Sequence, residues 1–418
     1  MKITKVCFVL SLFLAFSCSK KEEQVEMADY VVGRPITVSM AEIRNAVAIQ
    51  EPRPTEEAGK MYQYDDFIFV NENNKGVHII KGLEEERLQK IKFLNIPGNK
   101  DISIRDGYLY ADSYLDLVVF DISDIDNIQQ LTTLENVFPN YYNFYVEGAD
   151  WFNLEGVDFE NEIIIDWELV VESHPVIEYD IFIEGDISGG QSSNGGSGNV
   201  SMTGNGGSLA RFKIVEDYLY IVQENHLMVF EITNLIDPVF ESTQYVGQAI
   251  ETIFHNEGFL YLGSSSGMFI YSLAVPQEPL FISTVSHILG CDPVVVKDNY
   301  AYVTIRGGNF CGQEVSELDV IDISDKNNPF IATSVEMIEP YGLGVRDKSL
   351  YVSDGEAGIK LFNIENPTGI FLENEFEDIH ILDIIPLEEK LLMVGDNTLY
   401  IYHYLDGNLE LSHTFNLD

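Results

Sequence analysis

The residues best suited to chemistry recur at a fixed distance from a repeated aromatic or aliphatic triplet. Nine positions before the last residue of each triplet, the chain reads Lys60, Asp101, Arg211, Thr252, Pro293, Gly342 and Asp383. Four of these seven residues are charged, with both signs present, although the segments around them are apolar. This column predicts either a self-neutralising polar ring, which we favour, or a pocket for a small polar ligand or a cation.

Other charged residues fall close to this column in the predicted fold. They are Asp112, Asp292, Arg306 and Asp354. In a pocket, the carboxyl groups of Asp112, Asp292 and Asp354 could supply general acid–base chemistry. Ca²⁺ is a weaker alternative, because no known calcium-loop spacing is present. No histidine pair has helical spacing, and Gly263–Gly267 is typical of a turn and not of a nucleophile elbow. We therefore assign no catalytic residue, no metal ligand and no cofactor.

The triplets themselves mark an internal repeat. Their copies are Phe67-Ile68-Phe69, Tyr108-Leu109-Tyr110, Tyr218-Leu219-Tyr220, Phe259-Leu260-Tyr261, Tyr300-Ala301-Tyr302, Ser349-Leu350-Tyr351 and the degenerate Lys390-Leu391-Leu392. Four of the six spacings between them are 41 residues. A second apolar run follows each triplet, and turn residues separate the runs. Seven units of four short strands predict an all-β fold, a seven-bladed β-propeller over residues 51–418.

We name the strands of each blade A to D, from the innermost to the outermost. The column then lies near the start of strand A, where side chains can line the axial channel. The nearly continuous apolar runs are expected because the middle strands of a blade are covered on both faces by neighbouring blades.

The second apolar run resembles the repeated strand of the LVIVD-repeat family of bacterial and archaeal β-propeller proteins. Leu117–Asp121 and Leu318–Asp322 match it best, and the resemblance extends over roughly residues 58–418. It implies the propeller fold. It implies no particular activity, because the family as a whole has no agreed one.

Two insertions interrupt the repeat and point to one face. The longer, at about residues 140–208, falls in a D–A connection between blades 2 and 3, and the shorter follows Tyr302 in a B–C loop. Both kinds of connection lie on the same face of a propeller, which we call the loop face and predict to be the binding face. The long insertion contains expected strands around Trp151, 163–167 and 176–182, whereas residues 185–208 are rich in glycine and serine and predict a mobile linker.

Two cysteines fall near the shorter insertion. Cys291 and Cys311 remain as an even pair once Cys7 and Cys18 are assigned to the N-terminal leader and its processing site. A disulfide between them would close a loop of about 20 residues and stabilise the fold by about 3 kcal/mol. The surrounding sequence also resembles a recurrent block of the LVIVD-repeat family, which supports the pairing.

The N-terminus predicts export and lipidation. Residues 1–17 combine two lysines with an apolar run, as in a secretory signal peptide. The segment ending at Cys18 resembles the lipobox of bacterial lipoproteins, in which the cysteine is lipidated. Residues 18–50 are then expected to form a lipidated tether, with a helical pattern only near Met40–Ala48. The expected location is the outer membrane, with the cell-surface side favoured.

The charge limits the possible partners. The chain has 68 acidic and 24 basic residues, for a net charge of -44. Such a surface repels nucleic acid. We expect a monomeric, non-catalytic scaffold that binds a protein or a glycan at the cell envelope. The alternative is a hydrolase or lyase that acts on an extracellular polymer with acids at the channel mouth.

Overall fold

The computed structural model describes residues 27–139, 146–175, 203–286, 293–307, 315–377, 379–405 and 408–418. Within these ranges the chain forms two compact units. The first, which we call the small sheet, contains residues 27–38 and 146–175, and the second, the ring, contains the other described residues. No helix in the described part is long and apolar enough to cross a membrane.

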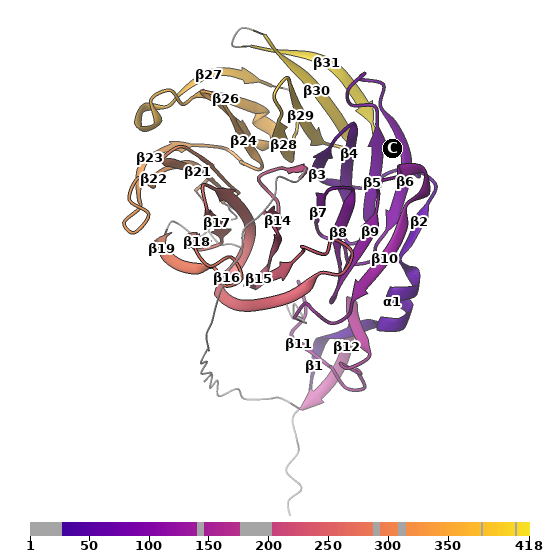
Figure 1. Ribbon diagram of the computed structural model, residues 1–418. Helices are drawn as coiled ribbons and strands as arrows, with labels where there is room; N and C mark the ends of the chain where they lie inside the picture. The colour runs from indigo at the N-terminus through magenta and orange to yellow at the C-terminus, as the bar shows by residue number, and fades with distance from the viewer. Residues whose placement is uncertain are drawn as a thin grey trace, which may run out of the picture. The chain divides into compact units, whose positions relative to one another are not determined.

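The ring is built of four-stranded antiparallel repeats (Figure 1). Repeats 1 and 2 are β3 (Ala58–Tyr64), β4 (Phe67–Glu72), β5 (Gly76–Lys81) and β6 (Gln89–Asn95), then β7 (Ile102–Arg105), β8 (Tyr108–Ser113), β9 (Asp116–Asp121) and β10 (Gln129–Leu134). Repeats 3 and 4 form one continuous sheet of β14 (Phe212–Val215), β15 (Tyr218–Glu231), β16 (Val239–Asn256), β17 (Phe259–Ser264), β18 (Gly267–Ser272) and β19 (Leu280–Ser286). In this sheet β15 supplies the second and third strands of repeat 3, and β16 supplies the fourth strand of repeat 3 and the first of repeat 4.

The remaining repeats follow the same plan. Repeat 5 is β20 (Val294–Lys297), β21 (Tyr300–Ile305), β22 (Glu317–Asp322) and β23 (Phe330–Glu336). Repeat 6 is β24 (Leu343–Arg346), β25 (Ser349–Ser353), β26 (Ile359–Asn363) and β27 (Phe371–Phe376), and repeat 7 is β28 (Asp383–Pro386), β29 (Lys390–Gly395), β30 (Thr398–Leu405) and β31 (Asn408–Asn416). Short 3-10 helices lie at Ile125–Asn127, Gly355–Ala357 and Pro367–Gly369.

The A strands of the described repeats contact one another in a closed circle. The order of contact is β3, β7, β14, β16, β20, β24, β28 and again β3. This arrangement is a β-propeller, and the all-β propeller predicted from the repeated apolar runs is confirmed.

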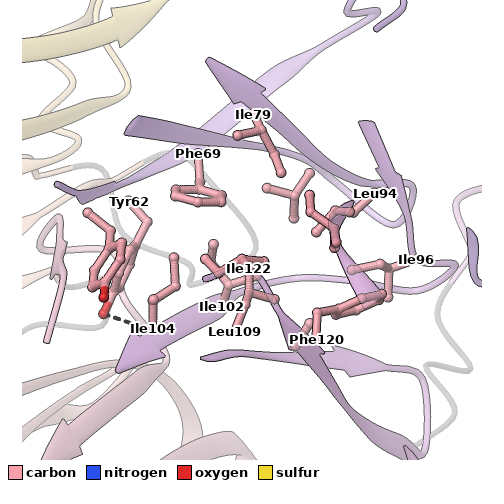
Figure 2. Close-up of a cluster of buried hydrophobic side chains, with 14 of the residues drawn as sticks. Tyr62, Phe69, Ile79, Leu94, Ile96, Ile102, Ile104, Leu109, Phe120 and Ile122 are labelled. Atoms are coloured by element: carbon pink, nitrogen blue, oxygen red, sulfur yellow. Dashed lines mark hydrogen bonds between the residues drawn. The ribbon is translucent and has the colours of Figure 1, made fainter. Parts of the chain in front are cut away.

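Apolar clusters lie between neighbouring repeats, so the ring has no single central core. The cluster between repeats 1 and 2 brings Phe69 and Ile79 against Leu109 and Phe120, all with 0% of their surface exposed (Figure 2). Equivalent clusters join each following pair, and one joins repeat 7 to repeat 1. Burial on both faces of each sheet explains why the strands read as continuous apolar runs.

Each outer strand of the described repeats carries a β-bulge near its start. The pairing between strands C and D shifts after the second paired residue of D in repeats 1 to 6 and after the fourth, Leu411, in repeat 7. A bulge bends and twists a strand, which discourages further pairing at that point. In repeat 1, β2 pairs with β6 beyond its bulge.

The N-terminal part differs from the tether expected over residues 18–50. From Met27 onward the chain forms β1 (Met27–Ser39), α1 (Met40–Ala46) and β2 (Ala48–Gln50). In the small sheet, β1 lies between β11 (Trp151–Phe152) and β12 (Glu162–Pro175). The helical pattern near Met40–Ala48 is confirmed, and a capping box between Ser39 and Glu42 begins the helix.

Candidate functional site

The structure places the predicted column at the starts of the A strands. Asp383 is the first residue of β28, whereas Asp101, Arg211, Pro293 and Gly342 directly precede their strands, and Lys60 and Thr252 lie within theirs. Three polar members, Asp101, Thr252 and Asp383, are buried. The charged members therefore meet near the axis of the ring, on the loop face.

Asp101 joins the A strands of repeats 2 and 3. One carboxylate oxygen accepts a hydrogen bond from the backbone N–H of Ile102 at 2.8 Å. The other accepts from the N–H of Arg211, and from that of Phe212 at 3.2 Å. Backbone N–H groups of the neighbouring repeat therefore occupy this carboxylate.

Asp383 makes the equivalent connection between repeats 7 and 1. Its two oxygens accept from the N–H groups of Met61 and Ile384, each at 3.0 Å. Burial raises the pKa of Asp383 from 3.8 to about 6, although the two N–H donors and the cation of Lys60 oppose this rise.

A third buried carboxyl group, Asp112, lies beside Asp101. Its Oδ1 accepts from the N–H groups of Lys100 and Asp101 at 2.9 and 3.0 Å, and from the amide of Asn99 at 2.9 Å. Burial raises the pKa of Asp112, against these donors. Like the column carboxylates, this group fixes the start of an A strand.

Lys60 is the exception among these charged groups. Its Nζ lies 3.7 Å from Oδ2 of Asp101 and is buried without a hydrogen-bond partner among the described residues. Burial lowers the pKa of the Lys60 amine, the carboxylates of Asp101 and Asp383 oppose this, and the cation of Arg211 adds to it. The cluster therefore groups two basic residues, Lys60 and Arg211, with three acidic ones, Asp101, Asp112 and Asp383.

The end of the long insertion runs into this cluster. β13 (Asn205–Gly206) pairs with β3, which adds a strand inside repeat 1. Thr203 forms a bridge to Arg105, and the N–H of Leu343 donates to Oγ of Ser208 at 2.9 Å. Residues 203–208 therefore connect repeats 1, 2 and 6, and the mobile linker expected over 185–208 does not describe them.

A small cavity lies beside this cluster among the described residues. A cavity of about 40 Å³ is lined by Tyr62, Ser103, Gly204, Gly207 and Lys213, among others. It has room for a few water molecules but not for a sugar ring or a peptide. Burial lowers the pKa of the Lys213 amine on this wall.

A second polar cluster lies on the loop face around Tyr341. The guanidinium of Arg306 stacks over the Tyr341 ring, 4.1 Å from its centroid, and the ring of His380 meets it edge-on at 5.5 Å. His380 Nδ1 lies 3.0 Å from Oδ1 of Asp396, and the Tyr341 hydroxyl donates to Glu339 at 2.9 Å. We call these five residues the Tyr341 cluster.

Asp354 is held beside this cluster. Its Oδ1 accepts from the N–H groups of Ile338 and Glu339, each at 2.8 Å, and its Oδ2 pairs with Lys360. These contacts leave it poorly suited to Ca²⁺. In the described ranges, no group of three or more histidine, cysteine, aspartate or glutamate side chains is arranged to hold a metal ion.

Several predicted residues lie outside the described ranges. They are Cys18, Cys291, Asp292 and Cys311. The lipidation site, the disulfide and one column neighbour therefore stay predictions.

Sequence reasoning found the column but missed its partners. Arg211, Phe212 and Met61, which donate to Asp101 and Asp383, come from other repeats, and residues 203–208 were assigned to a linker. Tyr341 directly precedes Gly342 of the column, and its aromatic type is the one signal that could have found the second cluster.

The fold shows the class of protein, and the repeated strands show which sequence repeat the chain contains. The chain is a β-propeller, and three of its segments, residues 98–128, 206–244 and 291–337, match the LVIVD repeat. The chain thus contains LVIVD repeats, and the resemblance seen at Leu117–Asp121 and Leu318–Asp322 is confirmed.

Solved structures support the fold alone. A candidate 6-phosphogluconolactonase from Bacteroides fragilis NCTC 9343 is 10% identical, with a TM-score of 0.53 over 88% of this chain and 98% of that one. The computationally designed Ika8 protein is 9% identical, with a TM-score of 0.51 over 88% of this chain and 90% of that one. No curated protein matches the chain.

Proposed function

We propose that the protein is a non-catalytic scaffold that binds a protein or glycan partner through its loop face. The observation that carries this proposal is the use of the axial carboxylates. Asp101, Asp112 and Asp383 all accept hydrogen bonds from backbone N–H groups, and together these bonds join repeats 2, 3, 7 and 1. Groups used in this way stabilise the ring.

A hydrolase or lyase at the channel mouth receives less support. General acid–base catalysis needs a carboxyl group within hydrogen-bond reach of a bound substrate. The adjoining cavity of about 40 Å³ is too small for a polymer unit. A Cβ atom on Gly207 would lie 2.0 Å from the Asp383 carboxylate, so the backbone already closely covers this acid.

The Tyr341 cluster is the better candidate for contact with a partner. It combines a guanidinium, a phenol and an imidazole, groups that can recognise carboxylates and hydroxyls by hydrogen bonding. His380 and Asp396 keep 31% and 68% of their side-chain surface exposed. A ligand on the loop face could reach both.

Photo-crosslinking in the full-length chain tests this proposal. A photoreactive residue at position 380 should capture a partner from the cell envelope, or one glycan from an array. Arg306→Gln, combined with the same photoreactive residue, should lower capture several-fold. Asp347→Asn is the matched control, because Asp347 is 74% exposed and lies in an A–B turn on the opposite face. Capture that is equal in all proteins, or cleavage of a polymer that is lost in Asp101→Asn, would overturn the scaffold proposal.

We also propose that Cys18 anchors the protein in the outer membrane, with the ring outside the cell. The signal-like residues 1–17 and the lipobox-like segment before Cys18 support this. Cells should incorporate radiolabelled palmitate into the wild-type chain and not into Cys18→Ser. A membrane-impermeant biotin reagent should label the wild-type protein on intact cells. Equal palmitate incorporation by both chains would contradict the anchor, and labelling only after lysis would place the ring on the periplasmic side.

A further inference from the structure

The start of strand D offers a comparison at one position across the seven described repeats. We consider the residue two positions before the unpaired bulge residue, which pairs with the last residue of strand C in repeats 1 to 6 and with His403 in repeat 7. In repeat order this residue is Gln89, Gln129, Val239, Leu280, Phe330, Phe371 and Glu410. Repeats 1, 2 and 7 show that the fold accepts a polar side chain here. The apolar residues of repeats 3 to 6 therefore need another explanation.

These four residues, which we call the apolar arc, are well exposed. Val239, Leu280, Phe330 and Phe371 keep 50%, 45%, 57% and 57% of their surface accessible. Single exposed apolar residues are ordinary on a protein surface. Four in consecutive repeats at one structural position are not explained in that way, and such surfaces mark interaction sites.

Packing within each repeat does not account for the arc. The cross-strand partners of its members are polar: Glu231, Ser272, Asp322 and Asn363. The residue after the arc residue does pack inside the repeat in two of the strands. Phe240 and Phe281 make edge-to-face contacts with Phe230 and Tyr271, with ring centroids 5.5 Å apart. Packing inside the repeats thus explains some of the apolar residues that follow the arc residues in their strands. It explains little of the apolar character of the arc residues themselves.

Hydrogen bonds link the outer strands of repeats 3 and 4 to the C–D turn of the next repeat. The side-chain amide of Gln244 in repeat 3 donates to the carbonyl of Pro279, directly before Leu280, at 3.0 Å. Ser283 in repeat 4 donates to the carbonyl of Lys326, in the turn before Phe330, at 2.6 Å. The turns that precede Leu280 and Phe330 are therefore fixed by the neighbouring repeat, and Figure 1 shows β19, β23 and β27 at the outer edges of their sheets.

The charge around the arc indicates what kind of molecule would cover it. From the end of strand C to the end of strand D, repeats 3 to 6 hold ten acidic residues and one basic residue, Lys326. This charge opposes a second copy of a chain with a net charge of -44, and it opposes an anionic lipid surface. It complements a segment whose apolar side chains are flanked by lysine or arginine.

We propose that the apolar arc is a docking surface for a protein segment that presents apolar side chains between basic residues. The surface lies beside the C–D turns, on the opposite side from the loop face, and does not depend on the function proposed above. The four arc residues lie before the bulges of their strands, whereas the strand added in repeat 1, β2, pairs beyond the bulge of β6. Recognition of the arc would therefore proceed through side chains.

Three peptide probes test this proposal by fluorescence anisotropy with the full-length protein. They are an amphipathic leucine–lysine peptide, a leucine–glutamate peptide and a serine–lysine peptide. The leucine–lysine peptide should bind most tightly. A variant with Val239→Ser, Leu280→Ser, Phe330→Ser and Phe371→Ser should bind it about tenfold more weakly or worse, at the level of the serine–lysine peptide.

The matched control carries Gln89→Ser and Gln129→Ser, at the same position in repeats 1 and 2, and should bind like the wild type. Urea denaturation checks that both variants stay folded. Milder single variants, Phe330→Gln and Phe371→Gln, replace the fourfold variant if it unfolds. Unchanged leucine–lysine binding by the arc variant would overturn the proposal. Arc-dependent binding to phosphatidylglycerol vesicles, or arc-dependent self-association in sedimentation, would also overturn it in favour of a lipid or a second copy.

Discussion

Asp383 shows what a single buried carboxyl group contributes to the ring. It is 0% exposed, and it holds two backbone N–H groups while the covering backbone keeps water away. The column that contains it could be read from the 41-residue spacing. Its donors could not, because Met61 lies 322 positions away and contacts it only when the ring closes.

Asp383 should make stability depend on pH in an unusual direction. Burial raises its folded pKa from 3.8 to about 6, so the folded state binds the proton more tightly than the unfolded state does. Its contribution is complete below about pH 4 and is lost as the pH rises through about 6. Relative to Asp383→Asn, the wild type should lose on the order of 3 kcal/mol of unfolding free energy between pH 4 and 7.

Urea denaturation of both proteins across this range measures the difference. The comparison is necessary because burial lowers the pKa of His255 to about 4, and that group stabilises the fold in the opposite sense, as the pH rises. Asp298→Asn, at an 81% exposed position, should show no such trend against the wild type. A difference between wild type and Asp383→Asn that is independent of pH would show that Asp383 ionises normally.

At the scale of the element, sequence patterns predicted the ring strands and missed the strands whose partners lie far along the chain. The ring strands repeat, and each copy supports the assignment of the others. β1 is a single strand of mixed polarity whose parallel partner places Val32 opposite Trp151. Without a repeat or a nearby hairpin, composition alone predicted a tether there.

The glycine-rich segment that ends the long insertion was misread for a related reason. Its composition is typical of a linker, but residues 203–208 use small side chains for close approach. Gly207 faces the Asp383 carboxylate, and a Cβ atom on Gly204 would lie 2.3 Å from the Tyr62 ring. Glycine permits both flexibility and tight packing, and the sequence does not distinguish these uses.

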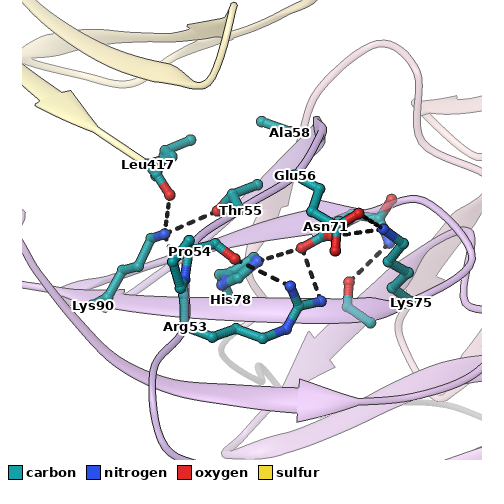
Figure 3. Close-up of polar contacts among 12 residues, drawn as sticks. Arg53, Pro54, Thr55, Glu56, Ala58, Asn71, Lys75, His78, Lys90 and Leu417 are labelled. Carbon is teal, nitrogen blue, oxygen red and sulfur yellow. Dashed lines mark hydrogen bonds and ion pairs between the residues drawn. The ribbon is translucent and has the colours of Figure 1, made fainter.

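At the scale of the ring, the described sheets close without a strand shared between the first and last repeats. An apolar cluster joins repeats 7 and 1. Polar contacts between residues 53–58 and 90 of repeat 1 and residues 397 and 417–418 of repeat 7, which we call the clasp, complete the closure. The N–H of Thr55 donates to the carbonyl of Leu417 at 2.9 Å, and the Lys90 amine bonds the same carbonyl (Figure 3). Beside them, Arg53 pairs with the buried Glu72, which also pairs with His78.

Asn397 is the centre of this clasp and should determine much of its strength. Its Oδ1 accepts from the N–H of Ala58 at 2.8 Å, and its amide donates to the carbonyls of Thr55 and Glu56 at 3.2 and 3.1 Å and to Asp418 at 2.9 Å. Its φ of 52° is in the left-handed region, so Asn397→Gly removes the side chain without straining the backbone. We expect this variant to lose about 2 kcal/mol of unfolding free energy.

Asp396→Gly is the matched control, because Asp396 precedes Asn397 in the same turn, has a φ of 46° and is 68% exposed. Both variants gain similar freedom in the unfolded chain, so their difference reports the clasp less the small contribution of the exposed contact between Asp396 and His380. Hydrogen exchange should then show faster opening of β3 and β28 in Asn397→Gly than in the control, since these A strands meet where the ring closes. Equal stability of the two variants would mean that the apolar cluster between repeats 7 and 1 closes the ring without the clasp.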